Sequence, residues 1–355
     1  MKPFSVKPLP VKGDLETKKI LKKLANSHRA LAELKGISKS IPNETILINT
    51  LGLQEAKDSS AVENIITTHD DLYKAELKTK KIESLESKEV QNYVEALKKG
   101  FELTSKQRLM TIRMIIEIQS ILEKNEAGFR KVPGTTLKNN ATGEVIYTPP
   151  QDITTIEHLM ANLEEYINID VSNDVDPLIK MAIIHFQFES IHPFYDGNGR
   201  TGRIINVLYL VLKGLLDLPI LYLSKFIIEH KSEYYKKIQA VRDDNNYEDW
   251  VLFILEGVEQ TAVDTIKTIS KIQSLLLKQK HIIRKNYKFY SQDLLNNLFK
   301  HPYTKIEFVE EDLGVSRITA ANYLNTLAKD GLLTKKKLGV TNYYINHELF
   351  DILST

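Results

Sequence analysis

The chain has 355 residues, of which 42% are hydrophobic and 26% are charged, a composition typical of a soluble globular protein. Its formal net charge of +2 gives no strong electrostatic attraction to nucleic acid or to a membrane. The sequence has no cysteine, which excludes disulfides, thiolate chemistry and cysteine-based zinc sites and fits a reducing compartment. At this length we expect two or three domains.

The sequence predicts neither a secretion signal nor a membrane span. Residues 1–14 contain scattered lysines and prolines without a continuous apolar run. The most apolar stretch, residues 204–223, is interrupted by Lys213 and Asp217, so we interpret it as a buried helix followed by a turn. We therefore expect a cytoplasmic protein that does not enter the membrane.

Apolar residues recur at helical spacing through most of the first half of the chain. The predicted helical regions are residues 15–34, 51–77, 87–99 and 105–125, with breaks at Gly36 and Pro42. Between Gly128 and Pro150 the pattern changes to glycines, threonines and a pair of prolines. This change predicts a loop with short extended pieces, such as a β-hairpin.

Helical patterns resume in the second half of the chain. The expected helices are residues 154–167, 176–189, 203–213, 223–240 and 247–277. Residues 261–290 form a basic segment with seven Lys or Arg and one acid, Asp264. Because its isoleucines and leucines keep helical spacing, we interpret this segment as a helix that connects two domains.

The last 65 or so residues, 291–355, have the pattern of a separate C-terminal domain. Three short helical patterns, near residues 291–299, 305–312 and 316–329, precede two alternating runs at 332–338 and 342–346, with a turn at Gly339. Helix-turn-helix followed by a β-hairpin predicts a winged helix.

The most informative stretch is residues 192–203, His-Pro-Phe-Tyr-Asp-Gly-Asn-Gly-Arg-Thr-Gly-Arg. His192 precedes a proline and therefore lies in a loop or turn, where a neutral imidazole can take a proton from an attacking hydroxyl. Asp196 offers a hard oxygen ligand for a magnesium ion that is shared with substrate phosphates. Phe194 is apolar within a polar loop, and we expect it to anchor the loop in the core.

The same stretch has the residues of an anion site. Gly197, Asn198 and Gly199 allow a tight turn that points backbone N–H groups inward at a helix N-terminus. Arg200 and Arg203 are three residues apart and thus neighbours on a helix, with forked donors that match phosphate oxygens. These residues together predict phosphoryl or nucleotidyl transfer.

Residues 192–203 resemble the signature of the Fic family, His-x-Phe-x-[Asp/Glu]-Gly-Asn-Gly-Arg-x-x-Arg, at every fixed position. The resemblance extends over about residues 101–257. It includes the helical run before the motif, the segment Ile146-Tyr147-Thr148-Pro149-Pro150 as the end of a target-docking flap, and the pair Tyr234-Tyr235 after the motif. Arg242 stands in some alignments where the family has an asparagine, and we do not count it as a site residue.

The resemblance implies a mainly α fold and transfer of AMP from ATP to a Ser, Thr or Tyr hydroxyl of a target protein. The fold would be a Fic helical core (91–265) with a β-hairpin flap, an N-terminal helical region (1–90), a basic connecting helix (266–290) and a C-terminal winged helix-turn-helix (291–355). His192 would be the general base and Asp196 would hold Mg²⁺. The nucleotide would be bound by Glu63, Asp196, Gly197, Asn198, Gly199, Arg200, Thr201, Gly202, Arg203, Tyr234 and Tyr235, and the target by Val145, Ile146 and Tyr147.

A second motif predicts self-inhibition. Ser59 and Glu63 are four residues apart and share a face of a helix, and Ser59-x-x-x-Glu63-Asn64 resembles the family's inhibitory motif, [Ser/Thr]-x-x-x-Glu-[Gly/Asn]. A carboxylate paired with Arg203 removes the partner of the γ-phosphate, so that ATP binds in a pose unsuited to in-line attack. In some relatives the same glutamate assists the removal of AMP, and the sequence leaves both directions open.

Other functions stay open from the sequence. The same fold can remove AMP or transfer another phosphate-containing group. A regulator of a different class would bind DNA through Arg317, Asn322 and Lys329 with a basic wing at 335–337, while the Fic core senses nucleotide. However, residues 291–355 have seven Lys or Arg against eight Asp or Glu, which favours a docking or dimerisation module over a DNA reader. A homodimer is possible because family members often dimerise.

Overall fold

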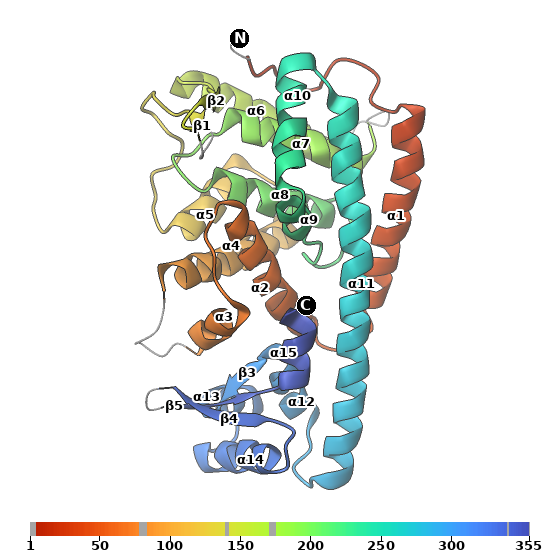
Figure 1. The fold of residues 1–355 in the computed structure, drawn as a ribbon, viewed down its shortest axis with the longest axis vertical. Helices are drawn as coiled ribbons and strands as arrows, with labels where there is room; N and C mark the ends of the chain where they lie inside the picture. The colour runs from red at the N-terminus through yellow and green to blue at the C-terminus, as the bar shows by residue number, and fades with distance from the viewer. Residues whose placement is uncertain (1–4, 78–83, 139–141, 170–174, 339–340, 355) are drawn as a thin grey trace. The chain divides into compact units, whose positions relative to one another are not determined.

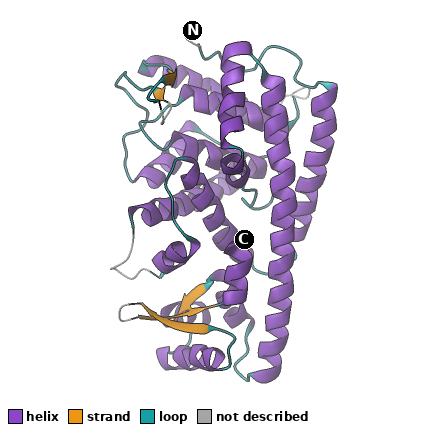
Figure 2. Cartoon of the chain, viewed as in Figure 1, coloured by secondary structure: helices purple, strands orange, loops and turns teal. Residues whose placement is uncertain are grey.

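The structure, a computed structural model, describes residues 5–77, 84–138, 142–169, 175–338 and 341–354. As predicted, it is mainly helical (Figure 1, Figure 2). Up to the motif, its elements are α1 (Lys18–Ser38), α2 (Glu44–Val62), α3 (His69–Glu76), α4 (Leu85–Gln107), α5 (Ile112–Glu123), β1 (Leu137–Lys138), β2 (Val145–Tyr147), α6 (Ile153–Asn168) and α7 (Pro177–Ile191).

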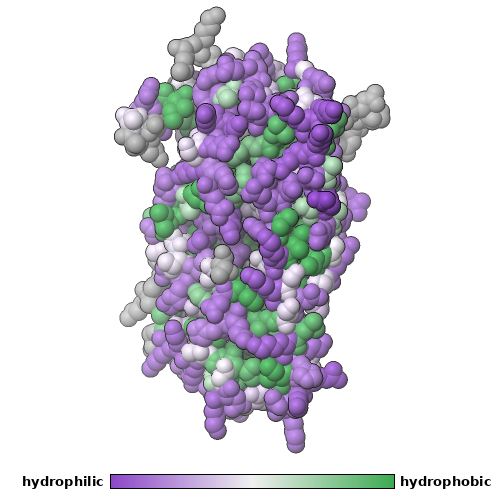
Figure 3. Space-filling view, turned by 45° about the vertical axis from the view of Figure 1, so that its right-hand side comes forward, coloured by the Kyte–Doolittle hydropathy of each residue, from purple (hydrophilic) through white to green (hydrophobic). Residues whose placement is uncertain are grey.

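From the motif onward the elements are α8 (Asn198–Leu212), α9 (Leu223–Glu229), α10 (Lys231–Asp244), α11 (Tyr247–Asn286), α12 (Gln292–Lys300), β3 (Tyr303–Lys305), α13 (Ile306–Leu313), α14 (Arg317–Lys329), β4 (Thr334–Leu338), β5 (Thr341–Ile345) and α15 (His347–Ser354). Within the described residues, no helix is long and apolar enough to cross a membrane. On the face drawn in Figure 3, hydrophobic residues lie in small groups among hydrophilic ones.

The chain divides into two compact units that are not continuous in sequence. The first consists of Met1–Ala32 and Glu95–Ala262, and the second of Glu33–Val94 and Val263–Thr355. The helices α1, α4 and α11 therefore contribute residues to both units. The domain boundaries expected from the sequence stay predictions, but compact packing groups residues 33–94 with the C-terminal domain.

The core of the first unit is built around α7. Every residue of this helix from Leu178 to Ile191 is buried, because α6 and α8 pack against it. Glycines allow the closest approaches between neighbouring helices. A Cβ atom at Gly202 of α8 would lie 2.8 Å from the Glu189 carboxylate on α7, and one at Gly100 would lie 2.5 Å from Leu208. The buried indole of Trp250 donates a hydrogen bond to the Ala182 carbonyl (2.8 Å) and ties α11 to α7.

In the second unit, α2 packs against α12, and the C-terminal domain forms a three-stranded antiparallel sheet in the order β3-β5-β4. The register pairs Tyr303 with Ile345 and Thr334 with Ile345, so β5 lies between the other two strands. The helices α12, α13 and α14 and the β4–β5 pair occur in the order predicted for the winged helix. The predicted turn at Gly339 lies outside the described residues.

Several predicted helix boundaries are wrong. Gly36 does not end the first helix, which continues to Ser38, because a glycine costs a helix only about 1 kcal/mol. The single helical region predicted at 51–77 is two helices, α2 and α3, separated at Glu63–Thr68, where Asn64 has a φ of 66°.

Three further boundaries differ. The region 87–125 divides at residues 108–111 rather than 100–104, with Arg108 at a φ of 53°. The region 223–240 is two helices that meet at His230. The helix predicted from Arg203 begins at Asn198, because Gly197 takes the left-handed conformation and starts the helix inside the motif. The strand β3 and the helix α15 were not predicted, since each is short and has no distinct signal.

Asn297 is the buried polar centre of the C-terminal domain. Its carbonyl oxygen accepts a hydrogen bond from the Thr304 hydroxyl (2.7 Å), and its amide donates to the Phe308 carbonyl (3.1 Å) and to Asp312 (2.8 Å). We expect Asn297→Ala to lower the free energy of unfolding of this domain by about 2–3 kcal/mol, because the buried Thr304 hydroxyl and the half-buried Phe308 carbonyl lose their partner. Urea denaturation followed by circular dichroism measures this change. Asn322→Ala, at an exposed position of α14, is the control, and equal losses for both variants would contradict the assignment.

Candidate functional site

The motif forms the junction between the two most buried helices of the first unit. The last residue of α7 is Ile191, and His192 is its C-cap in the left-handed conformation, with φ 50° and ψ 59°. The His192 backbone N–H donates to the Phe188 carbonyl (2.9 Å), which closes the last turn of the helix. The sequence prediction that His192 lies in a turn is therefore confirmed, and its side chain is partly exposed.

Asn198 closes the loop on itself. Its carbonyl oxygen accepts a hydrogen bond from the Phe194 backbone N–H, and its amide donates to the Phe194 carbonyl, both at 2.9 Å. The Phe194 ring is completely buried between Phe129 and Phe188, with ring centroids at 5.4 and 6.3 Å. The prediction that Phe194 anchors the loop is confirmed, and Asn198 fixes the path of the backbone around it.

The N-terminus of α8 has the form of an anion site. Gly197 is its N-cap with φ 75°, and a Cβ atom there would lie 2.3 Å from the Glu123 carboxylate. Both the left-handed backbone conformation and the lack of space for a side chain therefore require glycine. The first N–H groups of a helix have no acceptor within the helix and carry its positive end. The backbone of Asn198, Gly199 and Arg200 thus presents donors at this end.

The two arginines of the motif lie in different environments. Arg200 is buried and donates to the Glu123 carboxylate at the end of α5 (2.9 Å), with side-chain exposures of 4% and 13%. Arg203 is also buried, and its positive charge acts on His185 of α7. Burial first, and Arg203 second, lowers the pKa of His185 to about 3, so this imidazole is neutral beside the arginine.

Asp196 is exposed, and one of its carboxylate oxygens accepts a hydrogen bond from the Gly197 N–H (2.7 Å). The described residues contain no cluster of three or more His, Asp or Glu that would hold a metal ion without other ligands. A single exposed carboxylate beside a helix N-terminus fits a magnesium ion that takes its remaining ligands from phosphates and water. The predicted role of Asp196 stays a prediction.

The predicted flap is present as the β1–β2 hairpin, with Leu137 opposite Tyr147 and Lys138 opposite Val145. Val145 and Ile146 are exposed, at 49% and 46%. Tyr147 is buried instead, and its hydroxyl donates to the Ser190 carbonyl (2.6 Å). Tyr147 therefore anchors the flap on α7, and only the other two residues face outward.

Two arginines that the sequence prediction did not assign join the flap to the motif. The buried Arg130 side chain donates to the carbonyls of His192 (2.8 Å) and Pro150, and its backbone N–H donates to Pro193 (2.9 Å). The Arg242 guanidinium stacks on the Tyr147 ring at 3.7 Å. The sequence prediction does not count Arg242 as a site residue because it departs from the family pattern. Arg130 lies in a predicted loop, where the sequence gives no signal that an arginine is buried.

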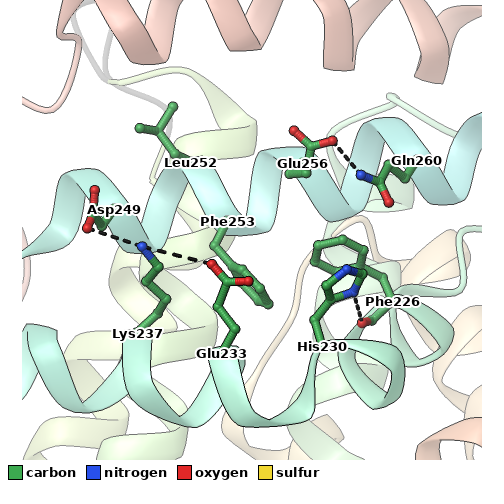
Figure 4. A pocket seen from close by; sticks show the side chains of 9 residues that line it. All are labelled: Phe226, His230, Glu233, Lys237, Asp249, Leu252, Phe253, Glu256 and Gln260. Carbon is green, nitrogen blue, oxygen red and sulfur yellow. Dashed lines mark hydrogen bonds and ion pairs between the residues drawn. The ribbon is translucent and has the colours of Figure 1, made fainter.

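The tyrosine pair on α10 is divided between the core and the surface. Tyr234 is buried, with its hydroxyl 2.9 Å from His185 Nε2, whereas Tyr235 is 46% exposed. On the same helix, a pocket of about 300 Å³ is lined by Phe226, His230, Glu233, Lys237, Asp249, Leu252, Phe253, Glu256 and Gln260 (Figure 4). Its charged groups pair with one another, as Lys237 does with Asp249 at 3.2 Å (Figure 4). The motif contributes no lining residue, so we do not assign this pocket to the site.

The second motif lies at the end of α2. Ser59 is buried within the helix, and Glu63 is the exposed C-cap residue. Asn64 follows with φ 66°, a conformation that glycine and asparagine adopt most readily. This backbone conformation fits the Gly or Asn that the motif has at its last position.

Comparison with known proteins covers most of the chain. Three family models match in succession: "Fic/DOC family N-terminal" at residues 21–102, "Fic/DOC family" at 109–210 and "Protein adenylyltransferase SoFic-like, C-terminal domain" at 275–349. The chain belongs to the Fic/DOC family.

Among curated Fic proteins, the chain is 31% identical to "Protein adenylyltransferase Fic" of Drosophila grimshawi over 103 residues, and 32% identical to that of Culex quinquefasciatus over 103 residues. These stretches cover 29% of the chain and only 20% and 19% of the relatives, so the chain matches about a fifth of their length.

Solved Fic structures share the fold. A Fic family protein from Desulfovibrio desulfuricans aligns with a TM-score of 0.57 at 19% identity, over 97% of the chain and 98% of its own length. A Fic domain containing signaling protein from Bacteroides thetaiotaomicron aligns with a TM-score of 0.55 at 19% identity, over 69% of the chain and 97% of its own length.

The Asn198 clamp gives a test of the Fic loop. We expect Asn198→Ala to leave the buried N–H and C=O of Phe194 without partners, which costs about 1–3 kcal/mol per group. Hydrogen exchange at residues 194–198 should become faster and the thermal midpoint should fall. Asn125→Ala is the loop control, because it removes two exposed hydrogen bonds, one accepted from the Ala127 backbone N–H and one donated to the Glu123 carbonyl. Unchanged exchange in Asn198→Ala would mean that Phe194 packing alone holds the loop.

The neutral His185 predicts a dependence of stability on pH. In the unfolded chain this histidine takes up a proton near pH 6.5, whereas in the folded chain its pKa is about 3. Its contribution is thus complete above pH 6.5 and is lost as the pH falls toward 3, at up to about 1.4 kcal/mol per pH unit. We expect the free energy of unfolding of His185→Gln to fall less steeply between pH 6.5 and 4.5. His281→Gln, at an exposed position, should keep the wild-type slope. Parallel curves for all three proteins would refute the assignment.

Proposed function

We propose that this Fic protein transfers AMP from ATP to a Ser, Thr or Tyr hydroxyl of a target protein. The proposal rests on one observation: the signature folds into a closed loop, residues 192–197, that leads from the C-cap of α7 directly into the first turns of α8. The name shared by the curated relatives, protein adenylyltransferase, supports it.

In the proposed step, the target hydroxyl oxygen attacks the α-phosphorus of ATP. The new P–O bond forms as the bond to pyrophosphate breaks, pyrophosphate leaves, and the hydroxyl proton passes to His192. The imidazole suits this role because two hydrogen bonds hold the His192 backbone: its N–H donates to the Phe188 carbonyl, and its carbonyl accepts from Arg130. The His192 side chain is partly exposed and so can receive the proton.

The phosphates would lie against the N-terminus of α8. Here Gly197–Arg200 would cradle the α- and β-phosphates, and Arg203 would hold the γ-phosphate. Bound Mg²⁺ would neutralise phosphate charge, with Asp196 as its protein ligand. Tyr235 is the exposed member of the pair proposed to lie near the adenosine, whereas buried Tyr234 supports it.

The target would add to the flap as an extended strand. The exposed β2 side chains of Val145 and Ile146 face outward for this contact, and Tyr147 fixes the flap to Ser190. Arg130 joins the end of the flap to the His192 carbonyl, so the docked hydroxyl and the base belong to one rigid network.

We further propose that Glu63 restrains the enzyme by competing with the γ-phosphate for Arg203. Glu63 is suited to this role because it is an exposed carboxylate at the end of a buried helix. The same glutamate suits the removal of AMP, which remains the alternative within the family fold.

DNA binding receives less support. Arg317 at the start of α14 pairs with Glu307 (2.8 Å) and Glu310 (3.6 Å) of α13, and Lys335 of the wing donates to Asn325 (2.8 Å). Two cations that a DNA reader would direct at phosphates are thus bound within the domain. A mobility-shift assay at physiological salt tests this alternative.

The central test uses ATP labelled at the α- or the γ-phosphate, with magnesium and a cell extract as the source of targets. We expect labelling that depends on His192 from α-labelled ATP only, because kinases in the extract transfer the γ-phosphate whatever residue stands at position 192. Glu63→Gly should raise it by about tenfold or more, because aligned phosphates react orders of magnitude faster than misaligned ones. His192→Ala should abolish labelling in both backgrounds.

Two surface variants are the controls: His158→Ala on α6 and Glu16→Gly before α1, both at exposed positions. Each should label as the wild type does. Labelling from α-labelled ATP that survives His192→Ala, or labelling from γ-labelled ATP that depends on His192, would sink the proposal of AMP transfer. Equal rates for wild type and Glu63→Gly would remove Glu63 as an inhibitor and leave the transfer reaction in place.

A further inference from the structure

The helix that ends in Glu63 is part of the same compact unit as the C-terminal domain. Of α2, eleven residues are buried, and this helix packs against α12 and α15. Halfway along it, the Gln54 side-chain amide donates to the backbone carbonyl of Leu353 in α15. Figure 1 shows the end of α15 beside α2.

The helix that follows Glu63 is attached to the same domain. The Tyr303 hydroxyl of β3 donates to the Asp70 carboxylate of α3 (2.6 Å), and the Lys305 ammonium donates to the Leu77 carbonyl (2.8 Å). The buried Tyr73 ring lies 5.5 Å from the Tyr303 ring and 5.9 Å from that of Phe350. Hydrogen bonds and ring contacts thus join α3 to the sheet and to α15.

Glu63 lies in the short turn between these two attached helices. Glu63 and Asn64 donate backbone hydrogen bonds to Ser60 and Ala61 (both 3.0 Å), and residues 65–68 then lead into α3. The Thr67 hydroxyl lies 3.3 Å from that of Ser87, which holds the second half of the turn. Because the helices on both sides of the turn contact the C-terminal domain, the position of the Glu63 backbone depends on how α2 and α3 pack on that domain.

We propose that Gln54, Asp70 and Tyr303 are positioning residues for Glu63, through which the C-terminal domain sets the strength of inhibition. The inference rests on the proposed function, since it concerns the regulation of AMP transfer. A partner that displaces β3 or α15 would loosen α3 or α2 and release the Glu63 carboxylate from its position. The C-terminal domain then acts on the reaction without contact with ATP or target.

Substitutions of Asp70 test the hydrogen bond to Tyr303 most directly. Burial raises the pKa of its carboxyl, but hydrogen bonds from Lys74 and Tyr303 outweigh burial and leave it below the ordinary value. Asp70→Ala removes the acceptor of the Tyr303 hydroxyl, whereas Asp70→Asn keeps an oxygen that accepts it. Tyr303→Phe removes the donor alone. The matched control is Tyr290→Phe, because the Tyr290 hydroxyl donates to Gln292, which is two residues away (3.3 Å).

The experiment measures labelling from α-labelled ATP in the full chain, with each variant made in the wild-type and Glu63→Gly backgrounds. We expect Asp70→Ala and Tyr303→Phe to raise the rate by about threefold to tenfold, as the loss of one hydrogen bond of ordinary strength implies. Asp70→Asn should return toward the wild-type rate, and Tyr290→Phe should equal it. In the Glu63→Gly background none of these changes should raise the rate further.

Three outcomes separate the inference from the proposed function. Wild-type rates for Asp70→Ala and Tyr303→Phe, beside a raised rate for Glu63→Gly, would overturn the inference alone. An equal increase in both backgrounds would also overturn it, because the effect would not pass through Glu63. Labelling that does not depend on His192 would overturn the proposed function instead. Hydrogen exchange at residues 44–62, expected to be faster in Asp70→Ala than in Asp70→Asn, checks that the loosening is local.

Discussion

The pair of hydrogen bonds between Asn198 and the Phe194 backbone is the constraint on which the site depends. Between Ile191 and Asn198 the chain must leave one largely buried helix and enter another. A loop of that length in the core leaves backbone groups without partners unless side chains supply them. Asn198 supplies both a donor and an acceptor, and the Phe194 ring fills the space beneath. The positions of His192, Asp196 and the first turn of α8 follow from this closure.

The same loop is held from outside by side chains that have no part in the signature. Arg130 binds the His192 and Pro150 carbonyls, and Arg242 covers the ring of Tyr147, whose hydroxyl binds Ser190. Cationic donors are strong partners for carbonyl oxygens when they are withdrawn from water. The flap is therefore attached to the C-terminal end of α7 through charge, although its own two strands are very short. A target strand added to the flap would be aligned relative to His192 by this network rather than by the hairpin.

The sequence predicted the chemistry of the site better than its supports, for a physical reason. Residues 192–203 need particular side chains at fixed spacing, and so they can be recognised in one dimension. Arg130 and Arg242 act through contacts between segments far apart in the chain, and local pattern says nothing of such contacts. Likewise the helical periodicity predicted most helices, but it missed the division of residues 51–77, because the break depends on the left-handed turn at Asn64. The flap strand was predicted as a unit, yet only the structure separates buried Tyr147 from exposed Val145 and Ile146.

The grouping of residues 33–94 with the C-terminal domain has a consequence for control. Arg203 belongs to the first compact unit and Glu63 to the second. The proposed pairing of Glu63 with Arg203 depends on how firmly each side chain is fixed within its own unit. Arg203 is fixed within the buried α8, so little of the variation can arise there. Glu63 is exposed on a turn between two helices that the C-terminal domain holds by packing and by a few hydrogen bonds, among them those at Gln54 and Asp70. In the proposed scheme, a partner that binds the C-terminal domain would shift Glu63 by displacing some of these contacts, of which each hydrogen bond contributes about 1 kcal/mol.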